Sequence, residues 1–478
     1  MIKSIKKVCS ENFFNESAFR IVYFISLFFS GVVFFDIISV ILDIVIFIWA
    51  FFILKNRLKN KTLNIKYSRI IFLFLLFAIV TACINISMGF PINFFAGLAI
   101  IYHIAVCFFI FYGAYGGTKF SDIKNEIILL CKILLTISTS LVILSFIVLL
   151  FGDSFSFEWT FPIIDNYEHY ERIIGIVKST GSVRFTGVFI NPNILAFSSV
   201  VSIIFCHILY RTNQFFNIEK KWTKILFMTL IVSTHFSALI LSDSIASFLF
   251  LVGYTVLWLF YKMILENKIS SMKTILKHGM IFFIGCLLLI FGLFTLRACF
   301  LSSASNALDE LYSIIMNNNS AEYIDDIRFG RPNHDIRNGS GRRLLLKQAA
   351  FIFSKHPLFG IGSTNIVDYG KIYFESGIAF SNFHNGYVSI LVCNGIIGFA
   401  LFMMFLLLIL INVIKFFLEN CSNLKDTVFV NLFISFLSYL IFALFEKTLL
   451  SEINFMGIFF WIILGYIMSF FMEYQKEN

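Results

Sequence analysis

Charged side chains are scarce in this sequence. Asp, Glu, Lys and Arg make up 14% of its 478 residues, whereas soluble domains carry about 25%. Hydrophobic residues make up 59%, and 64 residues are Phe. Water-soluble cores cannot hide that much apolar surface. The composition therefore excludes a set of soluble domains, and also a disordered or collagen-like chain. It predicts an all-α polytopic membrane protein.

Metal and cofactor motifs are also missing. The nine Cys residues form no C-x-x-C pair, so neither a disulfide framework nor a zinc site is supported. The eight His residues form no H-E-x-x-H motif, and the glycine-rich motifs that bind phosphate are absent from the sequence. No G-x-S-x-G motif lies near the candidate histidine described below, which argues against a serine hydrolase. We therefore expect neither a metal nor a cofactor.

The net charge of +9 suits two kinds of protein. It is typical of nucleic-acid binding, and also of membrane proteins that carry Lys and Arg in short cytoplasmic loops. No aromatic-rich basic patch or nucleic-acid motif accompanies the charge, so we expect contact with membrane lipids and no nucleic acid. Residues 1–17 are polar and basic, and we expect no cleavable signal peptide.

Long apolar runs predict the membrane spans, because one crossing needs about 20 mostly apolar residues. The run at 21–54 is ambiguous. As a single helix it would be roughly 50 Å long, too long for a hydrocarbon core about 30 Å thick, so we divide it near Asp36. Ten further spans bring the total to about twelve: 70–86, 94–115, 127–151, 190–210, 225–241, 245–265, 280–297, 386–417, 428–445 and 455–471.

The distribution of Lys and Arg supports this division. With twelve spans, the basic segments fall on one side of the membrane, which places both termini in the cytoplasm. Residues 1–297 then hold spans 1–9 with a smaller outward loop at 152–183, and residues 384–478 hold spans 10–12. The large outward loop between spans 9 and 10, at 298–383, mixes apolar and polar residues and predicts a small folded cap with helices.

Arg184 lies shortly before a predicted span. Asn191 and Pro192 are typical of an N-cap and a first-turn proline. The free backbone N–H groups at such a helix start favour an anion. Arg184 is therefore a candidate anion-binding residue at the outer surface. The alternative is an interfacial arginine that reaches lipid headgroups.

Arg342 and Arg343 begin a second predicted helix, which we expect Ser340 to cap and Pro357 to end. Two cations in a first turn oppose the helix dipole, at about 0.3–1 kcal/mol each. An anion bound both by these arginines and by the N-terminus of the helix accounts for two cations in the first turn. The planar fork of arginine suits a phosphate, because it donates two parallel hydrogen bonds. A solvated charged face is the alternative.

His384 stands where the large loop re-enters the membrane. An imidazole with an ordinary pKa of about 6.5 is a natural general base near neutral pH. A structural cap of the next span is the alternative. The combination favours a catalytic role, because two outward arginine sites and one outward histidine at membrane re-entry points can bind a lipid-linked phosphate beside a reacting hydroxyl.

At these positions the sequence resembles the superfamily of O-antigen ligases and O-antigen polymerases. Residues 184–193 look like its R-x-x-G…P-N segment, and residues 340–362 are similar to its S-G-R…H-P-x-x-G-x-G segment. Residues 384–398 look like its H-N-x-x-L…G-x-x-G segment, and the twelve-span layout also agrees. There are two departures. Ile245 stands where an Arg is usual, and Leu346 stands where a Trp is common.

The resemblance implies a metal-independent inverting glycosyltransferase of the GT-C kind. It would be a multi-pass protein of the bacterial inner membrane with its active site facing the periplasm. Its donor and acceptor would be oligosaccharides linked to undecaprenyl pyrophosphate. By position, His384 corresponds to the general base, and Arg184 and Arg342 to the pyrophosphate-binding arginines. The substrate-binding set is completed by Arg343, Asn385 and Tyr387.

These residues fit more than one function. We favour an O-antigen polymerase, because the large loop is long and the chain is rich in Phe, Ile, Lys and Asn, as such polymerases often are. An O-antigen ligase, which uses a lipid A-core sugar as acceptor, fits the same residues. A flippase of lipid-linked sugar would predict internal symmetry and charges at the bilayer midplane. In a structural scaffold, His384 would be freely replaceable. Whether a chain-length regulator binds is left open.

Overall fold

The computed structural model describes residues 15–477, with gaps at 64, 90, 152–153, 164–165, 180–181, 217, 219, 267–284, 286–290, 308–309, 311–328, 330–340, 376–381, 421–426 and 451. The chain forms two compact units. Unit 1 comprises residues 1–30, 36–130 and 337–478, and unit 2 comprises residues 31–35 and 131–336. The predicted helix at 280–297 falls largely outside the described residues.

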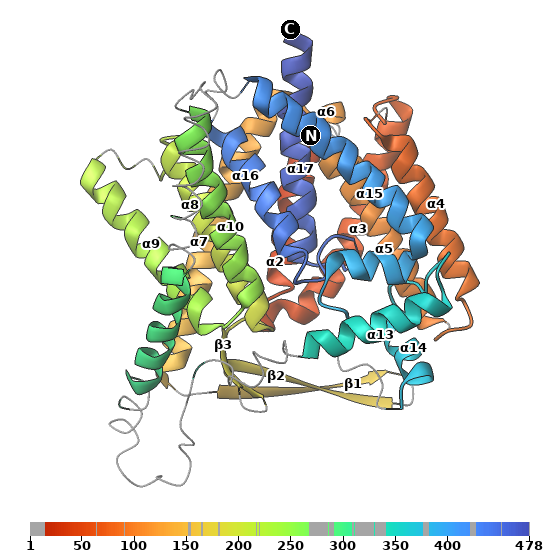
Figure 1. The fold of residues 1–478 in the computed structure, drawn as a ribbon, viewed down its shortest axis with the longest axis horizontal. Helices are drawn as coiled ribbons and strands as arrows, with labels where there is room; N and C mark the ends of the chain where they lie inside the picture. Colours follow the sequence, from red (N-terminus) through yellow and green to blue (C-terminus); the bar gives the residue numbers. More distant parts are fainter. Residues whose placement is uncertain are drawn as a thin grey trace, which may run out of the picture. The chain divides into compact units, whose positions relative to one another are not determined.

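Unit 1 is helical (Figure 1). Its α-helices are α2 (Glu16–Phe29), α3 (Asp36–Lys59), α4 (Ser68–Ile84), α5 (Ile92–Val106), α6 (Ala114–Gly117), the first part of α7 (Phe120–Phe151), α13 (Arg342–Lys355), α14 (Ile366–Tyr373), α15 (Gly386–Asn420), α16 (Thr427–Phe442) and α17 (Phe455–Glu477). A π-helical turn, η2 (Cys107–Tyr112), follows α5. Helix α17 is largely buried and packs against α2, α16 and η2.

Unit 2 combines helices with a small sheet. Its elements are η1 (Val33–Phe35), the second part of α7, β1 (Ser154–Ile163), β2 (Asn166–Ser179), β3 (Ser182–Gly187), α8 (Pro192–Arg211), α9 (Lys221–Leu241), α10 (Ile245–Phe260), η3 (Tyr261–Glu266) and a helix at 291–307. Asn191 caps α8 by accepting the N–H of Asn193 at 2.7 Å, and Pro192 occupies the first turn. This confirms the predicted cap and proline.

The all-α polytopic class is confirmed. Seven described helices are long and apolar enough to cross a membrane, and α4 and residues 428–442 of α16 are shorter apolar helices. Helix α4 exposes large apolar side chains such as Phe72 and Leu76, which a lipid environment covers without cost. The chain also breaks between Phe29 and Asp36. The predicted break near Asp36 is therefore confirmed, and a membrane crossing by each half stays a prediction.

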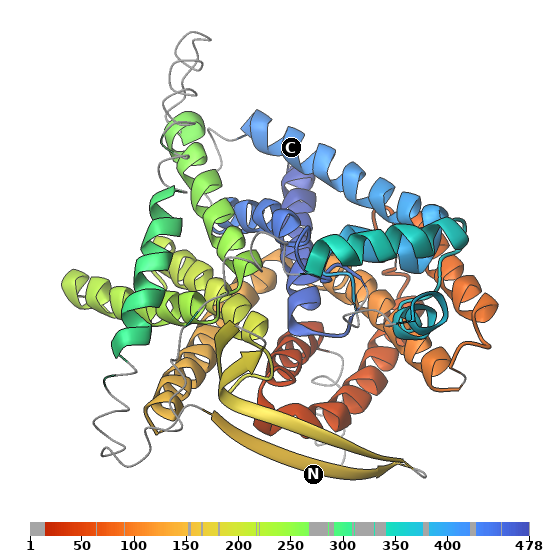
Figure 2. The ribbon, with the colours of Figure 1, turned by 60° about the horizontal axis from the view of Figure 1, so that its bottom comes forward.

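A three-stranded antiparallel sheet in the order β1-β2-β3 was not predicted (Figure 2). The paired strands β1 and β2 run in register from Ser154 opposite Gly175 to Ile163 opposite Asn166. Irregular pairing between Gly175 and Ile176 interrupts the ladder between β2 and β3. Strand β3 carries Arg184 and leads into α8, so this sheet positions one of the predicted site residues.

Helix α15, which follows the predicted histidine, has a break in its helical backbone. Gly395 has φ +61° inside the helix, and the loop 357–365 packs against the break. The N–H of Ile396 donates to the carbonyl of Pro357 at 2.8 Å. A Cβ at Gly395 would overlap the backbone of the loop, and Gly360 in that loop also has a positive φ of +72°. Two glycines of the predicted motifs thus allow two backbones to approach closely.

Candidate active site

His384 lies in the tight turn that enters α15. Its φ of +44° is unusual for a residue with a side chain. The backbone N–H of His384 donates to Asn382 Oδ1 at 2.8 Å, which stabilises the turn. Asn385 accepts the N–H of Val388 at 3.0 Å and so caps the helix. Strained backbone of this kind is often found where a side chain must be held in one direction for function.

The turn is attached to the segment that follows α16. Asn385 donates its side-chain amide to the carbonyl of Leu444 at 2.9 Å. The hydroxyl of Tyr387 donates to the carbonyl of Leu440 at 3.1 Å. These two predicted substrate-binding residues therefore fix the turn of His384 against the end of α16. A role in contacting substrate stays a prediction for both.

The carboxylate of Glu446 lies between His384 and Arg342. His384 Nδ1 is 3.4 Å from Glu446 Oε2, and Arg342 Nη2 is 3.9 Å from Glu446 Oε1. Arg342 also donates to the carbonyl of Phe445 at 3.3 Å, and its guanidinium lies over the ring of that residue. The side chain of Glu446 is 9% exposed, whereas those of Arg342 and His384 are 27% and 21% exposed. The structure thus brings together two of the predicted site residues around an acidic group.

The N-cap of α13 differs from the prediction. The helix begins at Arg342 and ends at Lys355, before Pro357, as expected. Its N-cap is Gly341, which has φ +76° and makes no side-chain cap bond. The predicted cap, Ser340, lies outside the described residues. Arg343 is exposed beside Arg342.

Arg184 belongs to unit 2 and is held by two acceptors. Its Nε donates to the carbonyl of Ser242 at 2.9 Å, and its Nη2 donates to Asn193 Oδ1 at 2.7 Å. The neighbouring Asp243 is buried and pairs with Arg297. Arg297 therefore brings a guanidinium from the helix at 291–307 to the turn that precedes Ile245. The meeting of Arg184 with His384 stays a prediction.

Sequence reasoning missed Glu446, although a signal for it exists. Glu446 and Lys447 interrupt the apolar sequence at the end of the span predicted at 428–445. The predicted spans at 386–417 and 428–445 would return the chain to the side of His384, which would put this charged pair beside the histidine. Lys447 Nζ lies 3.5 Å from Glu452 Oε1. Burial, together with the charge of Glu446, raises the pKa of Glu452, and the charge of Lys447 opposes that shift.

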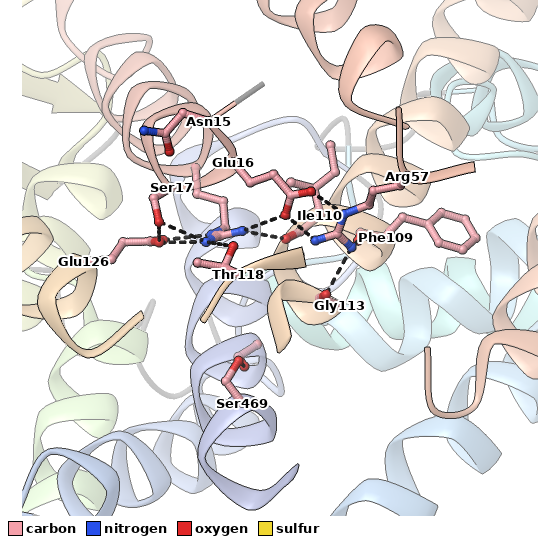
Figure 3. Close-up of polar contacts among 12 residues, drawn as sticks. Asn15, Glu16, Ser17, Arg57, Phe109, Ile110, Gly113, Thr118, Glu126 and Ser469 are labelled. Carbon is pink, nitrogen blue, oxygen red and sulfur yellow. Dashed lines mark hydrogen bonds and ion pairs between the residues drawn. The ribbon is translucent and has the colours of Figure 1, made fainter. Parts of the chain in front are cut away.

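A second charged cluster in unit 1 lies where α2 begins (Figure 3). Arg20 donates from Nε and Nη2 to the two oxygens of Glu126, at 2.8 and 2.7 Å. The hydroxyl of Tyr466 donates to Glu126 Oε1 at 2.8 Å. Glu16 pairs with Arg57 beside them. Arg20 is fully buried and Glu126 is nearly so, so this ion pair joins helices and is shielded from solvent.

Comparison with known families gives a match to part of the chain. Residues 225–403 match the family described as O-antigen ligase. The match supports the O-antigen ligase-like superfamily and a type of function shared by ligases and polymerases. It covers Arg342 and His384 but neither Arg184 nor Glu446. A search of curated proteins finds no match to the chain. Among the described residues, no cluster of three or more His, Cys, Asp or Glu is suited to a metal ion.

Proposed function

We propose that the protein is an O-antigen polymerase of the bacterial inner membrane. It transfers a glycan from undecaprenyl pyrophosphate to a sugar hydroxyl of another lipid-linked repeat, at the periplasmic face and without a metal. The observation that carries the proposal is the grouping of His384, Glu446 and Arg342 at one end of a membrane-spanning unit. The family match over residues 225–403 supports it.

In this reaction His384 is the general base. The acceptor hydroxyl attacks the anomeric carbon of the donor sugar, and the bond from that carbon to the phosphate oxygen breaks. The proton of the hydroxyl passes to Nε2 of His384, while Glu446 faces Nδ1 at 3.4 Å. The carboxylate orients the ring and stabilises the imidazolium that forms. Undecaprenyl pyrophosphate leaves with the bonding electrons.

Arginines stabilise the leaving diphosphate. Negative charge grows on it in the transition state, and fixed guanidinium groups in a partly dry site lower the energy of that charge. Arg342 is placed for this role, because it is partly exposed and lies within 3.9 Å of the carboxylate that faces the base. Arg184 and Arg343 are the other two residues proposed to bind diphosphate. Asn385 and Tyr387 hold the turn of His384 in place.

A glycan profile of a strain that lacks this protein tests the proposal. Loss of a polymerase leaves single repeats on the lipid A-core. The family match also favours the ligase as a second candidate. Loss of a ligase leaves long polymer on undecaprenyl pyrophosphate and none on the lipid A-core. An unchanged profile would exclude both functions.

A further inference from the structure

A cavity lies in unit 1 between the segment 115–123, where α7 begins, and the last turns of α17. Its volume is about 230 Å³. One water molecule needs roughly 10–15 Å³ of such space, so the cavity has room for a phosphate group and the carbons attached to it. We infer that this cavity binds the headgroup of an anionic phospholipid. The site is separate from the one proposed for glycan transfer and has no part in that reaction.

The charges on the lining favour an anion. Lys119 directly precedes α7, and Lys476 lies in the last turn of α17. Both lysines line the cavity and are exposed, and Glu473 is the carboxylate among the described residues of the lining. Two cations and one anion leave a net positive charge. That charge complements the single negative charge of a phosphate diester, for which lysine is a common partner.

Thr118 adds a hydrogen-bond donor that is already held in place. Its Oγ1 lines the cavity region and accepts from Arg20 Nη2 at 3.1 Å (Figure 3). Among the described residues, no acceptor takes the hydroxyl proton of Thr118. An ionised phosphate group has only acceptors, so this proton suits it. Because Arg20 is fixed by its pair with Glu126, little ordering is needed when the headgroup binds.

The rest of the lining distinguishes a lipid from a free phosphate ion. Phe120, Ile123 and Met472 give the cavity apolar wall as well as charge. A phosphate ion would gain nothing from these side chains, whereas the glycerol and acyl carbons of a phospholipid bury apolar surface against them. The carboxylate of Glu473 accepts hydrogen bonds. Phosphatidylglycerol supplies hydroxyl donors beyond its phosphate, and phosphatidylcholine supplies none.

The position of the cavity along α17 also suits a headgroup. This helix is long and apolar enough to cross a membrane. It begins after the segment that carries Glu446, and the cavity lies at its C-terminal end. The ends of such a span reach the level of the lipid headgroups, where lysine side chains extend to phosphates. Basic cavities between helices on the cytoplasmic side, where we expect the C-terminus, are typical places for anionic headgroups.

Replacing the two lysines of the cavity tests the site. The variant Lys119→Gln with Lys476→Gln removes both cations, and both side chains are exposed, so the fold should tolerate the change. The matched control is Lys55→Gln with Lys59→Gln. These two lysines are exposed near the end of α3 and do not line the cavity. The control changes the net charge by the same amount, on the same predicted side of the membrane.

Native mass spectrometry of the purified protein in detergent measures the affinity for each lipid. The probes are phosphatidylglycerol and phosphatidylcholine. We expect the native protein and the control to bind the first phosphatidylglycerol about tenfold more tightly than phosphatidylcholine, a factor within reach of two lysines near a membrane surface. The variant of Lys119 and Lys476 should bind both lipids equally. Phosphatidylglycerol should also raise the melting temperature of the native protein and the control, but not of this variant.

Three results would overturn the headgroup site: a native protein without preference for phosphatidylglycerol, a preference that survives in the variant of Lys119 and Lys476, or an equal loss in the control. If that double variant does not fold, Lys119→Gln and Lys476→Gln decide singly. Each should lose part of the preference, and native-like binding in both counts against the site. Inorganic phosphate should leave the melting temperature unchanged, and a rise equal to that with phosphatidylglycerol would assign the cavity to a free anion instead of a lipid.

Discussion

The two charged clusters of unit 1 use similar residues in opposite ways. At the cluster of Arg20 and Glu126, the two side chains are 0% and 1% exposed, and two donors of one guanidinium meet both carboxylate oxygens at 2.7–2.8 Å. Around Glu446 the separations are 3.4 and 3.9 Å, and the side chains of His384 and Arg342 are partly exposed.

This difference separates a structural cluster from a candidate site. Charges inside a membrane protein need partners, because leaving one unpaired in a low-dielectric interior is expensive. Arg20 directs further donors to Thr118 and Ser17, so its hydrogen-bonding capacity is used within the protein. The looser arrangement around Glu446 leaves His384 and Arg342 accessible to a ligand. Substitutions should therefore affect stability at the first cluster and turnover at the second.

The largest effect on turnover is expected from His384→Ala. Without a general base, glycan transfer should fall by about 10²–10⁴-fold, while the melting temperature of the purified protein stays near that of the native protein. His384→Asn is the sharper variant, because Asn tolerates a positive φ but cannot serve as the base. Polymer length on gels and the transfer rate in vitro measure the loss. An intact glycan ladder in His384→Asn would refute the base assignment.

Glu126→Ala should damage the fold instead. It leaves Arg20 buried without its carboxylate, a change that costs about 3–5 kcal/mol when one partner of a buried pair is removed. We expect a large drop in melting temperature and poor recovery of folded protein in detergent. Glu446→Ala is the comparison variant and should melt close to the native protein. Equal melting temperatures for both variants would remove the distinction between the two clusters.

Much of the fold follows from local sequence signals. The apolar runs predict the helices, the excess length of residues 21–54 predicts the break before Asp36, and Asn191 with Pro192 predicts the start of α8. Long apolar runs indicate helices and do not reveal the sheet, whose strands contain no such run. In β1, Phe155, Phe157 and Trp159 alternate with polar residues, which is a period-two strand signal.

The candidate site was only partly predictable for a different reason. The helix at Arg342 and the turn at His384 are local features, so the sequence indicates them. His384 and Glu446 are 62 residues apart in the chain. In the sequence, only the number of predicted membrane crossings between them suggests that they meet. The need for glycine at position 395 is also non-local. A Cβ there would overlap backbone atoms of a loop that lies more than 30 residues earlier in the chain.

A moderate effect is expected from Arg342→Lys. The charge is kept, but the paired donors that fit a phosphate are lost, so turnover should fall by about tenfold, equivalent to about 1.4 kcal/mol. Arg343→Lys, one residue away and exposed, should change the rate less. Initial rates with the lipid-linked repeat as substrate measure both. Equal rates for Arg342→Lys and the native protein would assign Arg342 a structural role beside Phe445.

The smallest effect is expected from Glu446→Gln, because Gln keeps the shape of the side chain and a hydrogen-bonding oxygen. The carboxylate acts through His384, so we expect kcat to fall several-fold, less than the loss from Arg342→Lys, with little change in KM. Glu446→Asp should restore part of kcat, because it returns the negative charge. A rise in KM with kcat unchanged would show instead that Glu446 contacts the substrate. In that case the cluster around Glu446 would bind substrate, and Glu446 would not orient a base. The cluster would then differ from the buried pair of Arg20 and Glu126 through its affinity for a ligand.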